Sequence, residues 1–309
     1  MKHTIKRWME NNLSLVFILL FIGLGLWLLP FNSIMGEGQL YNETFLANTT
    51  VNITNAAPLI TAISLQTPID LRSYNTTNIT CNVSVFDFDN DSVLVNATFY
   101  LEGTSNPLSP DDNNSHYTNT NCTLLSPQDL NMNYSCVFSI EYYADNSSQW
   151  LCNATVSDQG FVPTSNESNY ATVNPLVAIK MDPLLDYGDL EVGQTSPDTL
   201  ANITNAGNRD ANISVDGYGS VDGDGLAFNC SFGSITLDYE RYDSVSGTPY
   251  GGMSLLTDTS TMIPNFYVPQ RTNDAAESIN STYWKVQIPV GAGGVCNGKI
   301  LFSATDRGN

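Results

Sequence analysis

The sequence predicts an all-β protein in which two tandem β-sandwich domains follow an N-terminal hydrophobic helix. Two observations indicate the β class: apolar and polar residues alternate with a period of two in several short segments, and clusters of Gly, Asn, Asp and Pro separate those segments. In the second half of the chain no helical periodicity lasts longer than a turn or two. A length of 309 residues suffices for about two domains.

An uncharged run of 19 residues, 13–31, follows three basic residues at the start of the chain. As a helix it would span roughly 28 Å, which suits one membrane crossing. This length favours an uncleaved signal anchor within residues 1–38, while Gly36 and Gly38 also suit the processing site of a cleaved signal peptide. The next basic residue is Arg72, so the positive-inside rule places the chain after the run outside the membrane. With an anchor the protein stays on the outer face of the membrane, and with cleavage it is secreted.

A polar stalk is expected over residues 39–56, and a first domain over residues 57–174. In the segments 78–86, 92–101 and 150–157 apolar residues alternate with Asn, Ser and Thr. Side chains on a strand point alternately to opposite faces, so each segment would bury one face and expose the other. We therefore expect the cysteines of the first and third segments to point inward.

Six cysteines lie beyond the hydrophobic run, and in an oxidising compartment they indicate three disulfides. Two inward cysteines near the start and end of one domain, with an aromatic residue beside the second, are typical of an immunoglobulin-like (Ig-like) sandwich. A second pair would staple a hairpin of that domain, and the last two cysteines fall in the second domain. The predicted pairs are Cys81–Cys152, Cys122–Cys136 and Cys230–Cys296.

The second domain is expected over residues 175–309. Asn174 and Pro175 mark its start, because proline cannot continue a central strand ladder. Alternating segments recur at 211–215, 283–290 and 299–305, between turn-forming clusters.

Glycosylation sequons of the form Asn-x-Ser/Thr are about three times as frequent as the content of these residues would give by chance. This excess predicts a heavily N-glycosylated protein, although such residues also fill solvent-facing strand and turn positions. Beyond the hydrophobic run the 18 sequon asparagines are Asn42, Asn48, Asn52, Asn75, Asn78, Asn82, Asn90, Asn96, Asn113, Asn121, Asn133, Asn146, Asn153, Asn166, Asn202, Asn212, Asn229 and Asn280.

Residues suited to catalysis are sparse, and we expect no enzyme. The one histidine beyond the hydrophobic run, His116, lies in a polar stretch and is expected in a loop, without the rigid nucleophile that a catalytic triad needs. The exported part contains thirty acidic residues, so some carboxylates would lie close together by chance. Such a pair alone therefore does not indicate a glycosidase. The net charge of −20 argues against nucleic acid as a partner, because nucleic-acid binding requires a basic surface.

One acidic run, DFDNDS, places Asp87, Asp89 and Asp91 at alternate positions. Such oxygen-rich spacing suits hard cations, and Ca²⁺ is the one cofactor the sequence suggests. The run lacks the Gly and distal Glu of an EF-hand loop, and a polar turn in which Asp and Asn cap their own backbone is the competing interpretation. Asp222 and Asp224 are expected in a glycine-rich hairpin turn.

Two stretches carry a family resemblance. The first, from TCNVSVFDFDNDSVLVNATFYL to YSCVFSIEYYADNSSQWLCNATVSD, resembles the Ig-like or PKD-like modules of exported archaeal surface proteins. The second, with LDYGDLEVGQTSPDTLANITNAGNRDANISVDGYG and TYWKVQIPVGAGGVCNGKILFSAT, is similar to the β-sandwich that ends many of them. The resemblance implies a non-catalytic structural or interaction glycoprotein of the cell envelope. An adhesion module that binds glycans or proteins is the alternative, and an extracellular hydrolase a distant third.

The partners implied are the membrane, through the N-terminal helix, and other envelope proteins or further copies of the chain. The segment 40–54 contains β-forming residues that would suit pairing with an open sheet edge of a neighbouring subunit.

Overall fold

The computed structural model describes residues 46–52, 54–126, 128–159 and 163–308. The predicted membrane run, the processing site at Gly36 and Gly38, and Asn42 lie outside these residues. Among the described residues there is no helix long and apolar enough to cross a membrane. The described part of the predicted stalk, from residue 46, has no regular secondary structure.

Twenty strands and two short 3-10 segments, η1 (Leu237–Tyr239) and η2 (Tyr250–Gly252), make up the regular structure of the described chain. No α-helix occurs among these residues, which confirms the predicted all-β class. Residues Thr54–Asn309 form one compact unit that contains two hydrophobic cores.

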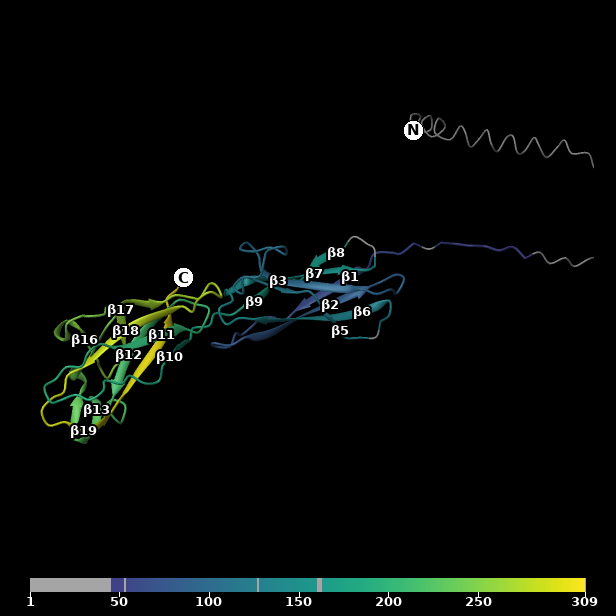
Figure 1. The fold of residues 1–309 in the computed structure, drawn as a ribbon. Helices are drawn as coiled ribbons and strands as arrows, with labels where there is room; N and C mark the ends of the chain where they lie inside the picture. The colour runs from purple at the N-terminus through teal and green to yellow at the C-terminus, as the bar shows by residue number, and fades with distance from the viewer. Residues whose placement is uncertain (1–45, 53, 127, 160–162, 309) are drawn as a thin grey trace, which may run out of the picture. The chain divides into compact units, whose positions relative to one another are not determined.

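The first core lies between two antiparallel sheets (Figure 1). One sheet has the order β1-β2-β6-β5, from β1 (Leu59–Leu65), β2 (Thr77–Phe86), β6 (Asn131–Ile140) and β5 (Thr123–Leu124). The other has the order β4-β3-β7-β8, from β4 (His116–Asn119), β3 (Leu94–Leu101), β7 (Ser147–Ser157) and β8 (Thr164–Glu167), and β9 (Ala171–Val173) also pairs with β7.

This strand order is that of an Ig-like sandwich, with strands A, B, E and D in one sheet and C, F and G in the other. Strand β4 extends the second sheet beside β3. Cys81 on β2 is bonded to Cys152 on β7, so a disulfide links the two sheets. Antibody domains place a tryptophan on strand C against this bond. Here Phe99 on β3 lies opposite Cys152, and its ring stacks on Trp150 of β7 at 4.4 Å between centroids.

The expected alternation accounts for the first core. Ile79, Cys81 and Val83 of β2 are fully buried, whereas Asn78 and Asn82 are exposed and Thr80 is half-buried. The same holds on β7, where every second residue from Trp150 to Val156 is fully buried. Each buried aliphatic side chain of this kind stabilises the fold by about 1.5–3 kcal/mol relative to an exposed one.

The second core is enclosed by three sheets. A five-stranded sheet has the order β10-β11-β18-β15-β16, from β10 (Ile179–Met181), β11 (Thr199–Asn205), β18 (Ile279–Val286), β15 (Glu240–Asp243) and β16 (Ser254–Leu255). A three-stranded sheet has the order β17-β12-β20, from β17 (Thr261–Val268), β12 (Ala211–Tyr218) and β20 (Lys299–Asp306). A second three-stranded sheet has the order β14-β13-β19, from β14 (Ser234–Thr236), β13 (Leu226–Phe232) and β19 (Gly293–Asn297).

Trp284 of β18 is fully buried in the second core, with Tyr242 and Phe302 against its ring. The other two disulfides of the described residues are Cys122–Cys136 and Cys230–Cys296. All three bonded pairs are those expected from the sequence, and no free cysteine occurs among the described residues.

Polar contacts connect residues on either side of the predicted boundary at 174/175. The buried amide of Asn208 donates to the carbonyls of Ala144 (2.9 Å) and Asn174 (3.1 Å), and its oxygen accepts from the backbone of Leu176 (2.6 Å). These bonds satisfy a polar side chain that would be costly to bury alone. The division into two domains stays a prediction.

Candidate metal site

The acidic run after β2 forms a tight turn. Asp87, the residue after β2, donates its backbone N–H to the carbonyl of Leu130 (2.9 Å), and its Oδ2 accepts the N–H of Asp91 (2.9 Å). Asn90 has a φ of 59°, in the left-handed region that asparagine tolerates better than most residues. Asp87 therefore caps its own loop, as the turn interpretation of the sequence expects.

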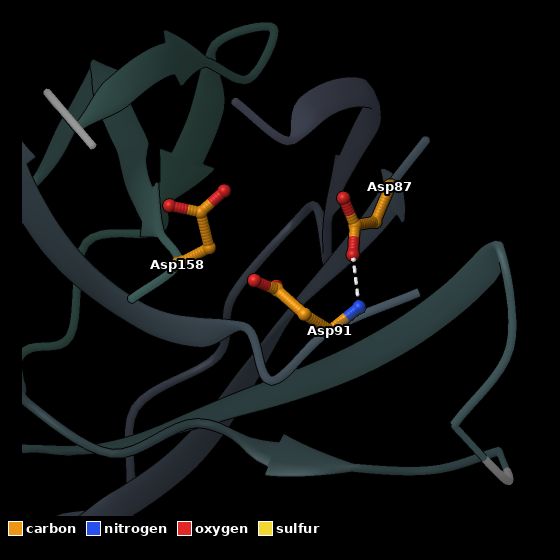
Figure 2. A group of neighbouring side chains, drawn as sticks. All are labelled: Asp87, Asp91 and Asp158. Carbon is orange, nitrogen blue, oxygen red and sulfur yellow. Dashed lines mark hydrogen bonds between the residues drawn. The ribbon is translucent and has the colours of Figure 1, made fainter. Parts of the chain in front are cut away.

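Asp158, the residue after β7, joins Asp87 and Asp91 in space. One carboxylate oxygen of each residue lies within 4.8 Å of the others, and Figure 2 shows the three carboxylates turned toward a common space. Asp87 is fully buried, and the other two are half-buried. The Oδ1 atoms of Asp87 and Asp91 and both carboxylate oxygens of Asp158 are buried without a hydrogen-bond partner.

The negative charge of this cluster has no nearby basic partner. The ion pairs of the described chain lie elsewhere, and Arg72 is the one basic residue between positions 37 and 175. Burial raises the pKa of the Asp87 carboxyl, and the charge of Asp89 raises it further. Burial also raises the pKa of Asp91, to which the charges of Asp87 and Asp158 add.

Asp89 is not part of the group of three. Its Oδ2 accepts the backbone N–H of Ala56 at 2.8 Å, and its side chain is exposed. The structure thus brings together two of the three predicted residues and adds Asp158. A signal for Asp158 was present in the sequence: CNVSVFD and CNATVSD each place Asp six residues after an inward cysteine, and an even offset on a strand keeps the same face.

The second acidic turn is a backbone cap. The Asp224 carboxylate accepts the N–H groups of Gly219, Ser220, Val221 and Leu226, and these bonds hold its pKa well below the usual range. Asp222, by contrast, is exposed. Because donors already occupy the Asp224 oxygens, this turn has the structural role that its glycine-rich sequence indicates.

His116 lies in a strand, and the expectation of a loop is wrong. It begins β4, is 1% exposed, and its Nδ1 lies 2.9 Å from Asp111 Oδ1. The neighbouring Ser115 donates its hydroxyl to Asp112 rather than to the imidazole. The His116 Nε2 is buried without a partner, so these side chains do not have the serine–imidazole contact of a catalytic triad.

A pocket of about 300 Å³ in the second sandwich contains one buried carboxyl, that of Glu240. Its lining includes Met181, Leu185, Phe228 and Phe302. The Tyr187 hydroxyl donates to Glu240 Oε1 at 2.6 Å. Asp182, the other acid in the lining, has an exposed side chain, so the pocket lacks a facing pair of buried carboxyls of the glycosidase kind.

No protein-family model matches the sequence, and no curated protein matches it. One similar solved chain comes from a structure reporting that a chaperone–tip adhesin complex is vital for synergistic activation of CFA/I fimbriae biogenesis. It has 7% identity and a TM-score of 0.31, over 81% of this chain and 83% of that one. The CupB6 tip adhesin from Pseudomonas aeruginosa has 8% identity and a TM-score of 0.22, over 81% and 96% of the two chains. Neither the sequence identities nor the TM-scores place the protein in the family of these adhesins.

Proposed function

We propose that the protein is an exported, N-glycosylated and non-catalytic structural or interaction module of the cell surface. Its three disulfides support export, because such bonds persist in oxidising compartments and are rare in the cytosol.

The exposure of the sequon asparagines is the observation that carries the proposal. Of the 17 that lie among the described residues, 12 are exposed, five are half-buried and none is buried. Asn205 and Asn208, which are fully buried, are not in sequons. A glycan is bulky and needs a side chain that reaches solvent, so this distribution favours modification over chance use of Asn, Ser and Thr.

A structural or protein-binding role fits better than a carbohydrate-binding face. Such a face would present several aromatic rings to solvent. Six aromatic residues could contribute to such a face; of these, Tyr142, Tyr143, Trp150 and Tyr242 are buried, and Tyr239 and Tyr250 are half-buried.

The glycan part of the proposal is tested by the intact mass of protein from its native host, measured before and after deglycosylation. We expect a mass above that of the polypeptide, which falls on deglycosylation. At the exposed Asn82, Ser84→Ala removes the sequon and should remove one glycan, while Ser84→Thr keeps the sequon and should keep the mass. A native mass equal to that of the polypeptide would refute glycosylation.

A further inference from the structure

We propose that Asp87, Asp91 and Asp158 bind one Ca²⁺ ion, which links the β2–β3 loop to the β7–β8 loop at one end of the first sandwich. This site goes beyond the proposed surface function and does not depend on glycosylation.

The first support is a buried carboxylate that lacks a partner. Asp87 is 0% exposed, and its Oδ1 is buried without accepting a hydrogen bond. Buried polar atoms of folded proteins nearly always have a partner, and an unpaired buried charge is strongly unfavourable. A cation between the three carboxylates would satisfy this oxygen and the three other unpartnered oxygens of Asp91 and Asp158 together.

The second support is the match to the ligand requirements of Ca²⁺. This ion takes six to eight oxygen ligands at about 2.3–2.6 Å, so two ligands on opposite sides of it lie about 4.8 Å apart. The three carboxylate atoms lie within 4.8 Å of one another. Four unpartnered oxygens are present, and two of them belong to Asp158. Asp158 could therefore bind through both oxygens, a mode that Ca²⁺ accepts. Waters would complete the shell.

The positions of the ligands show what the ion would do. Asp87 lies six residues after Cys81 on β2, and Asp158 lies six residues after Cys152 on β7. Six residues of strand span roughly 20 Å, so the ion would form a second link between the two sheets at that distance from the disulfide. The same loop also holds the chain ahead of β1, because Asp89 accepts the N–H of Ala56.

Calcium titration calorimetry of the full chain, after removal of metal with EDTA, tests the proposal. We expect one saturable site with a Kd on the order of 10⁻⁴ M, as in extracellular modules, and weaker binding of Mg²⁺. Asp158→Asn and Asp91→Asn should each weaken Ca²⁺ binding at least about tenfold, because each removes a charged ligand. Asp189→Asn, the same charge change at an exposed position in the loop between β10 and β11, creates no sequon and should leave binding unchanged.

Unfolding of the same proteins provides a readout that also detects a folding defect. Ca²⁺ should raise the unfolding temperature of the wild type and of Asp189→Asn relative to EDTA, and leave that of Asp158→Asn unchanged. Asp158→Asn should still show a cooperative transition in EDTA. If the wild type binds no Ca²⁺ at millimolar concentrations, the proposal is wrong. Equal binding by the wild type and both site variants would also overturn it.

Discussion

Glu240 carries a buried carboxyl whose surroundings make the stability of the protein depend on pH. Its side chain is 1% exposed and accepts a hydrogen bond from Tyr187. Burial raises its pKa to about 7 from an ordinary value of 4.5, although the bond from Tyr187 acts in the opposite direction. The folded chain therefore keeps a proton that the unfolded chain releases between these values.

Glu240→Gln should abolish this part of the pH dependence. The stability that comes from the neutral carboxyl is fully present below about pH 4.5 and is lost as the pH rises to about 7. Glutamine keeps an acceptor for Tyr187 and cannot ionise, so at pH 8 the variant should be more stable than the wild type by up to about 3 kcal/mol, with little difference at pH 4. Urea unfolding at both pH values measures this.

Glu191→Gln makes the same charge change on an exposed side chain and serves as the control, for which the stability should hardly change at either pH. A Glu240→Gln variant whose stability differs from the wild type equally at pH 4 and pH 8 would show that the pKa of Glu240 does not rise on folding.

At the scale of elements, the strands whose side chains face two different environments could be predicted from the sequence. Strands β2, β3, β7 and β12 have one face in a core, and the other face is half-buried or exposed except at Tyr100 and Leu151. Their apolar and polar residues therefore largely alternate with a period of two. Inward placement of Cys81 and Cys152 followed from that alternation, and their pairing was expected because immunoglobulin-like sandwiches join two such cysteines across their sheets.

Elements that depend on tertiary contacts could not be predicted in this way. His116 lies in a strand because β4 pairs with β3, where it stands opposite Tyr100. Strand β18 begins at Ile279, four residues ahead of the expected segment, because its exposed first residues pair with β11. Asp158 meets Asp91 across 67 residues of chain, so only the closed sandwich brings them together.

The cross-sheet disulfide gives a prediction at this scale, because Cys81 also lies directly opposite Cys136 on β6. Peptide mapping without reduction should recover Cys81–Cys152 together with Cys122–Cys136, and a Cys81–Cys136 peptide would contradict the link between sheets.

Replacing Cys81 and Cys152 together with serine should lower the free energy of unfolding by about 4 kcal/mol, the chain-entropy value for a loop of 71 residues. Urea unfolding of the oxidised proteins measures the loss.

For the whole molecule, the described residues combine two cores, three disulfides and a strongly acidic surface with sequons that reach solvent. Disulfides persist in oxidising compartments outside the cytosol, and exposed sequons are the acceptor sites for N-glycans on exported proteins. His116, the histidine that the sequence analysis weighed for catalysis, contacts Asp111. An exported, non-catalytic surface module accounts for these features together.

Labelling of intact native cells with a membrane-impermeant amine reagent tests this central claim most directly. Lys299 lies in β20 with an exposed side chain and provides a target amine, and a cytosolic protein of the same cells provides the negative control. We predict that the protein is labelled on intact cells to the same extent as after lysis, while the cytosolic control is labelled only after lysis. Labelling of the protein only after lysis would contradict a location on the cell surface.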